Sequence, residues 1–229
     1  MTTTQQHRLT YDAGELDFDR RVDEAQPEGD PGIGMQRIAG LDISLTASGI
    51  GIITRRVDGT CTAATTVITS RGTRADTLTD RNVRLIEIRN ELVHATGTST
   101  LVVIEGPSFG SKGASPLDRY GLWWLTVTAL LGVGVPVATC PPSTRARYAT
   151  GAGTSSKAGV ALAMARLWPQ WRASSDRTAD DEADALTLSH AGAVWSGWDV
   201  PTLQRHRDVL PAIAWPSRPS ELPSEVAVR

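Results

Sequence analysis

The segment 38–53 constrains the fold of this chain most strongly, because it has the pattern of a buried strand, a tight reversal and a second strand. It contains one charged residue, Asp42. Placing an ionised carboxylate on a buried apolar strand costs free energy unless the group is paired or holds a cation. Asp42 therefore either caps the turn through Ser44 and Thr46 or belongs to a charged site. Acidic residues elsewhere in the chain decide between these two interpretations.

The remaining sequence alternates strand and helix patterns in the order typical of an α/β protein. A turn at 57–59 leads to a third strand at 61–69, rich in β-branched residues, so the first three strands form an antiparallel meander. Short apolar runs at 101–105 and 135–140 indicate two further strands, the first of the buried parallel kind. Helical periodicity predicts helices at 76–95, 116–131, 156–168, 180–194 and 202–214. We therefore expect a mixed five-stranded sheet flanked by helices.

Composition divides the chain into three parts. The 229 residues are 40% hydrophobic, which is enough for one well-filled core. Residues 1–36 carry 3 basic and 8 acidic side chains, the composition of a disordered acidic leader. Residues 37–195 form the predicted domain, and their 16 Lys and Arg against 13 Asp and Glu are compatible with an anionic partner. Residues 196–229 form a C-terminal extension with no recognisable chemistry.

The same composition argues against several other protein classes. No segment approaches the roughly 20 apolar residues that cross a membrane, and the first residues lack the charged and apolar regions of an export signal. The two cysteines, Cys61 and Cys140, have neither CxxC nor histidine spacing, which disfavours a structural zinc site and a disulfide scaffold. We expect a soluble cytoplasmic protein without membrane contacts.

Acidic residues far apart in sequence are predicted to meet Asp42. Glu105 ends the fourth strand, which in a sheet of this order neighbours the first. Asp181 and Asp184 lie three residues apart on the helix predicted at 180–194 and so share a face. Acids in a first helical turn also complement the helix dipole, but that interpretation explains Asp184 poorly.

Carboxylates that converge in this way repel one another unless cations lie between them. Oxygen ligands favour Mg²⁺, with Mn²⁺ as a substitute. Two such ions roughly 4 Å apart suit an in-line displacement at phosphorus. The pattern therefore predicts hydrolysis of a phosphodiester bond.

These motifs resemble those of the RuvC family of Holliday junction resolvases. The segments 40–51, 103–105, 151–160 and 181–186 occur in the family's order and at similar spacing, over about residues 37–195. The resemblance implies an RNase H-like fold, a homodimer and two Mg²⁺ ions. It also implies paired nicks in a four-way DNA junction during recombination, repair or replication, in the cytoplasm of a bacterium or of a phage-infected host.

The resemblance also assigns roles to particular residues. It implies that Asp42, Glu105, Asp181 and Asp184 are the metal ligands and catalytic acids. It further implies that Lys157, in the motif Gly151 to Lys157, lies near the scissile phosphate, where a point charge offsets the charge of the transition state.

Four further residues are candidates for contact with DNA. Arg145 and Arg147, in the loop expected before Gly151, are placed for phosphate contacts, although an ordinary solvated loop explains them as well. Phe109 either stacks on or wedges between bases near the crossover, or anchors its own loop. Lys112 lies in the same loop after Glu105 and is the fourth candidate.

Three alternative functions share part of this pattern. A sugar or acetate kinase of the same superfamily also has a phosphate-binding hairpin, but it repeats the hairpin in a second domain, and no second copy is visible here. A non-catalytic DNA-binding protein would have no reason to keep all four acids. A nuclease with a broader preference for flaps and branched DNA is hardly distinguished from a strict resolvase by sequence.

Overall fold

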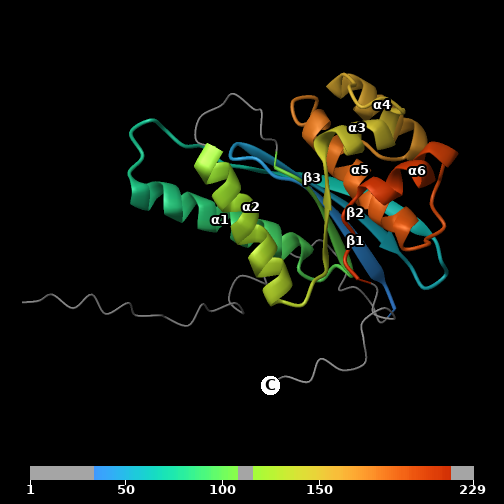
Figure 1. Ribbon diagram of the computed structural model, residues 1–229, viewed down its shortest axis with the longest axis horizontal. Coiled ribbons are helices and arrows are strands. Elements are labelled where there is room, and N and C mark those ends of the chain that lie inside the picture. Colours follow the sequence, from blue (N-terminus) through green and yellow to red (C-terminus); the bar gives the residue numbers. More distant parts are fainter. Residues whose placement is uncertain (1–33, 108–115, 218–229) are drawn as a thin grey trace, which may run out of the picture. The chain divides into compact units, whose positions relative to one another are not determined.

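A computed structural model of the protein describes residues 34–107 and 116–217 (Figure 1). These residues belong to one compact unit that begins at Gly34. Its five-stranded sheet has the order β3-β2-β1-β4-β5. The strands are β1 (Gln36–Asp42), β2 (Ala47–Arg55), β3 (Cys61–Thr69), β4 (Leu101–Glu105) and β5 (Val137–Cys140). Strands β1 to β3 are antiparallel, whereas β4 runs parallel to β1 and β5 parallel to β4, so the predicted mixed sheet is confirmed.

Helices cover both faces of this sheet (Figure 1). The helices are α1 (Leu78–Thr96), α2 (Pro116–Gly132), α3 (Pro142–Thr150), α4 (Lys157–Leu167), α5 (Ala179–Trp195) and α6 (Gln204–Val209), followed by a 3₁₀ turn, η1 (Leu210–Ala212). Helices α1 and α2 lie on one face, and α3 to α6 lie on the other (Figure 1). None of the helices in the described ranges is long and apolar enough to span a membrane.

Side-chain alternation along the strands divides the core in two. Ile38 on β1 and Val103 on β4 pack with α5, whereas Ala39 and Leu41 pack with α1 and α2. Continuing this period of two, Asp42 points to the α5 side of the sheet, as does Glu105. The pleat of the strands thus directs both carboxylates to one face.

Helix α5 lies directly on the backbone of β1 and β2. A Cβ atom at Gly40 would lie 2.1 Å from the carbonyl oxygen of Ala185, and one at Gly49 would lie 2.1 Å from that of Asp181. Asp181, Ala185 and Ser189, spaced four residues apart, therefore form the sheet-facing stripe of α5. Ala185 packs against the strands because their glycines admit the helix backbone so closely.

The loop predicted before Gly151 is instead the helix α3. Pro142 stands at its first position, where a missing N–H costs nothing. Gly151 ends the helix in the left-handed region, with φ of 88°, and its N–H donates to the carbonyl of Arg147. Both end signals are visible in the sequence, but a polar helix of nine residues has no strong apolar period. Arg145 therefore projects from a rigid element.

The described residues after 195 pack against this domain. Ala214 exchanges two backbone hydrogen bonds of 2.9 Å with Thr139 on β5. Val209 and Ile213 are buried in the same core as α5. The single helix predicted at 202–214 is divided into α6 and η1, because Pro211 has no N–H to continue the α-helical pattern.

Candidate active site

Two carboxylates end adjacent parallel strands. Leu41 on β1 is paired with Ile104 on β4, and the next residue in each strand is an acid, Asp42 and Glu105 respectively. The turn after Asp42 is closed by hydroxyl groups, because Ser44 Oγ accepts from Ala47 N at 2.9 Å and Ser48 Oγ donates to Ser44 O at 2.8 Å. The carboxylate of Asp42 acts electrostatically on Glu105 and on Arg145. The structure thus places Asp42 in a charged site.

Arg145 joins two of the acids. Its Nε donates to Oε2 of Glu105 at 2.8 Å, and its Nη1 donates to Oδ1 of Asp184 on α5. The three side chains are 8–13% exposed, so these ion pairs are nearly removed from water. One guanidinium from α3 thus connects the end of β4 to α5.

The charge on Glu105 is held in an unfavourable environment. Burial, and then the negative charge of Asp42, raise the pKa of Glu105 to about 8, although Arg145 acts in the opposite direction. Asp184 adds to the increase. Burial and the neighbouring acids therefore outweigh Arg145 and favour the neutral form of Glu105.

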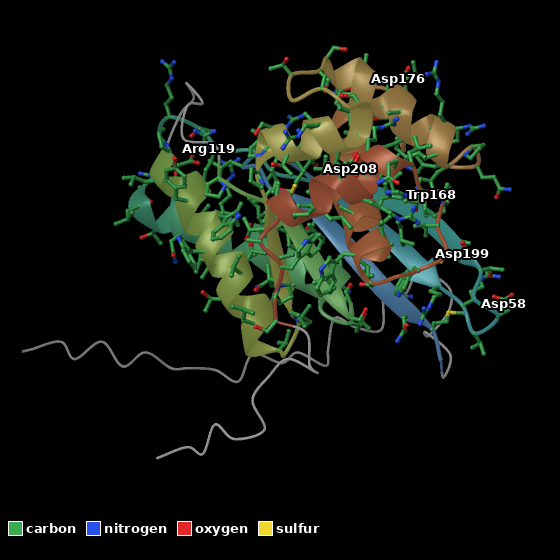
Figure 2. The ribbon with its side chains drawn as sticks, turned by 45° about the vertical axis from the view of Figure 1, so that its right-hand side comes forward. Asp58, Arg119, Trp168, Asp176, Asp199 and Asp208 are labelled. Carbon is green, nitrogen blue, oxygen red and sulfur yellow. The ribbon has the colours of Figure 1, made fainter. Side chains whose placement is uncertain are left out.

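A pocket of about 120 Å³ opens beside the two strand ends. Asp42 and Glu105 line one side, and α2 lines the other with Arg119, Tyr120 and Trp123. Trp123 Nε1 donates to the backbone carbonyl of Glu105 at 2.9 Å, which fixes α2 to the end of β4. Arg119 lies near the start of α2, at the opposite end of the molecule from Asp58 in Figure 2.

Comparison with solved structures identifies this architecture. The structure of Thermus thermophilus RuvC aligns with a TM-score of 0.55 and 21% identity, over 73% of this chain and 100% of that one. T. thermophilus RuvC in complex with Holliday junction substrate aligns with a TM-score of 0.53 and 21% identity, over 73% of this chain and 99% of that one. The chain has a RuvC-like fold. Comparison of the sequence with family models and with curated proteins gives no match.

The RuvC-like fold brings three of the four predicted acids together. Asp42, Glu105 and Asp184 interact electrostatically, with Arg145 among them. Asp181 lies one turn earlier on α5 and is half-buried, and among the described residues it is not one of the main charges that act on Glu105. Its role as a metal ligand stays a prediction.

The next acid on α5, Glu182, has a structural role in this fold. Its fully buried carboxylate accepts hydrogen bonds from Thr65 on β3, from the Ser174 backbone at 3.1 Å and from Thr178 at 2.8 Å. In the sequence, Glu182 is one of several acids in the first turn of this helix. In the tertiary structure these hydrogen-bond donors give Glu182 surroundings different from those of its neighbours in sequence.

The buried histidine of α5, His190, also has structural contacts. His190 Nδ1 lies 2.8 Å from the hydroxyl of Tyr148 on α3, and Nε2 lies 2.9 Å from the carbonyl oxygen of Pro201. The ring of His206 stacks on Tyr148 with a centroid distance of 4.5 Å. This aromatic cluster ties α3, α5 and α6 together behind the acidic site.

The predicted DNA-contacting residues have different outcomes. Arg145 belongs to the acidic site itself, and sequence reasoning missed this because α3 was not expected. Arg147 is exposed on the same helix. Phe109 and Lys112 lie outside the described residues. Lys157 begins α4 behind the capping residue Ser156, but its side chain is also outside the described part.

The chemistry of the acidic site fits a divalent cation, although its present arrangement does not enclose one. In the described ranges no three His, Cys, Asp or Glu side chains are grouped so that they would hold a metal ion as they stand. The acids Asp42, Glu105 and Asp184 outnumber the one guanidinium among them, and burial and the charge of Asp42 raise the pKa of Glu105. Carboxylate oxygens are the donors that Mg²⁺ and Mn²⁺ prefer.

Proposed function

We propose that this protein is a metal-dependent endonuclease that cuts four-way DNA junctions. The observation that carries the proposal is the pair Asp42 and Glu105 at the ends of adjacent parallel strands, with Asp184 of α5 acting on the same site. The RuvC-like fold supports it, because T. thermophilus RuvC has been described with a Holliday junction substrate. The resemblance of the sequence motifs to RuvC supports it independently of the coordinates.

Under this proposal Asp42, Glu105, Asp184 and the predicted Asp181 would hold Mg²⁺. When bound, the ions would supply an activated water and stabilise the leaving oxygen. The chain contributes a partly enclosed site next to a pocket lined by Arg119 and Tyr120 of α2. A guanidinium on that side favours the approach of a DNA phosphate. The role of Lys157 near the scissile phosphate stays a prediction from the sequence motif.

The substrate test compares three DNA molecules. A mobile four-way junction, a flap and a linear duplex are incubated with the full chain in Mg²⁺ and in EDTA. We expect symmetric nicks in the junction when Mg²⁺ is present and not in EDTA, and little cleavage of the duplex. Equal cleavage of the flap supports the broader branched-DNA nuclease. Binding without cleavage of any substrate in Mg²⁺ supports the non-catalytic alternative and refutes the proposed activity.

Substitutions of the acids test the site itself. Asp42→Asn and Asp184→Asn remove charge with little change of shape, and we expect cleavage to fall by about 10³-fold or more while the junction still binds. Asp58→Asn is the matched control, because Asp58 lies in the exposed turn between β2 and β3 (Figure 2). Undiminished turnover by either site variant would refute the assignment.

A homodimer is part of this proposal, since paired nicks in one junction require two active sites. Helix α2 presents the surface for it. Trp124 and Leu131 are 62% and 56% exposed, and Leu125 beside them is 37% exposed. Large apolar side chains grouped on one exposed helix mark an interaction surface. The second copy of this chain is the partner that the proposed reaction requires.

A further inference from the structure

The position of Arg145 raises a question that the proposed function does not answer. Its guanidinium contacts carboxylates from two elements that are far apart in sequence, Glu105 at the end of β4 and Asp184 on α5. The fork of an arginine bonds two carboxylates at once, which the single ammonium of a lysine does less well. Arg145 thus holds in place two of the groups proposed to bind metal.

We propose that Arg145 is the resident counter-cation of this site: it holds Glu105 and Asp184 together in the metal-free protein and releases them when a divalent cation binds. The inference rests on the proposed metal-dependent function and adds a specific role for one residue of α3. In this role Arg145 is a positioning residue that sets how much Mg²⁺ the site needs.

The charges favour such an exchange. Arg145 supplies one positive charge to three carboxylates, Asp42, Glu105 and Asp184, which act on it together. A divalent cation supplies twice that charge at a shorter distance from the oxygens. In a site nearly removed from water, each added positive charge stabilises the carboxylates more than it would at the surface. The metal therefore has an advantage over the guanidinium for the same oxygens.

Simultaneous occupation by both cations is disfavoured. The guanidinium nitrogens lie at hydrogen-bond distance from one oxygen of Glu105 and one of Asp184. A metal on those oxygens would lie close to a second positive charge in a medium that screens it poorly. The side chain of Arg145 is 13% exposed, so an edge of it already reaches solvent. Once released, Arg145 is free to contact a DNA phosphate, the role that the sequence predicts for it.

Metal titrations without DNA test the inference. The wild-type chain, Arg145→Ala and Arg145→Lys are stripped with EDTA, and their melting temperature and binding heat are followed as Mg²⁺ is added. We expect metal-free Arg145→Ala to melt about 5–10 °C below wild type, because buried carboxylates lose their partner. We expect its half-saturating Mg²⁺ concentration to be about tenfold lower than that of wild type, with Arg145→Lys between the two.

Arg147→Ala is the matched control, because this exposed arginine of the same helix has the same charge. It should bind Mg²⁺ like wild type. An unchanged Mg²⁺ midpoint in Arg145→Ala, or a higher one, overturns the inference while the wild-type response still supports a metal site. If Arg145→Ala does not fold, the midpoint of Arg145→Lys decides in the same way. The absence of any Mg²⁺ response in the wild type refutes the proposed function and this inference together.

Discussion

At the scale of single residues, burial shifts the pKa values of acids and of bases in this protein in opposite directions. It raises the pKa of Glu105 to about 8 and lowers the pKa of His190 to about 4 and that of His206 to about 3. In each case the neutral form is favoured, so these groups make stability depend on pH. The two classes act in opposite senses between about pH 4.5 and pH 6.5.

The buried histidine gives a testable dependence on acid. The folded-state pKa of His190, about 4, lies below its ordinary value of 6.5, so between these values the unfolded chain binds a proton that the folded chain does not. Stability is therefore lost as the pH falls from about 6.5 to about 4, by on the order of 3 kcal/mol. In urea unfolding experiments in EDTA, the free energy of unfolding of His190→Gln should depend less on pH than that of wild type over this range.

Glu105 contributes a pH dependence of stability of the opposite sign, but it is present in both chains. Its contribution therefore cancels when His190→Gln is compared with wild type. His94→Gln is the control, because His94 is exposed on α1. It should keep the wild-type slope. Parallel curves for wild type and His190→Gln would show that His190 is not the titrating group.

At the scale of elements, the acidic site depends on how closely α5 approaches the sheet. Gly40, Gly49 and Gly51 leave room for the backbone of α5, and Asp184 extends from this helix to Arg145. A side chain at any of these glycines would push the helix away from the strands. The distance from Asp184 to Glu105 is therefore set by residues with no chemistry of their own.

Gly40→Ala tests this packing. An added Cβ would lie 2.1 Å from the backbone oxygen of Ala185, so we expect a loss of about 3 kcal/mol of unfolding free energy. Gly132→Ala at the end of α2 is the matched control, since a Cβ there meets no atom within 4 Å and alanine favours a helix. Urea denaturation measures both variants. Wild-type stability in Gly40→Ala would mean that the helix tolerates displacement from the sheet.

At the scale of the whole molecule, the two faces of the sheet are covered differently. The face that carries the acids is covered by α5, and α3, α4 and α6 pack on α5. The opposite face is covered by α1 and α2, and α2 leaves large apolar side chains in solvent. In the proposed dimer, the second copy would bind at α2, whose first turns also line the pocket beside the strand ends.

Leu131→Glu tests this surface. A charge in the centre of an apolar interface opposes association, so we expect a dimer of the wild-type chain to become a monomer in light scattering after size exclusion. Leu162→Glu is the matched control, because Leu162 is 53% exposed on α4, on the other face of the sheet. A monomeric wild type at micromolar concentration would refute the dimer. Dissociation by Leu162→Glu alone would place the interface on α4.

The sequence by itself determined the strands and most of the helices, and it singled out Asp42, Glu105 and Asp184 as acids that would lie together. Periods of two and of about 3.6 residues are local properties, and they predict β1 to β5 and α1, α2, α4 and α5 because each element buries one side of its own pattern. Asp42 and Glu105 stand out in the sequence because each places a charge at the end of an apolar strand, where burial of that charge costs free energy.

Only the tertiary structure decided what each charged side chain contacts. Glu182 and Asp184 are two residues apart on one helix, yet one accepts hydrogen bonds from β3 and the other bonds Arg145. Arg145 itself comes from a short polar helix with no periodic signal. A charged side chain interacts with the groups that lie near it in space, and burial strengthens those interactions. A local pattern in the sequence therefore does not reveal the partners.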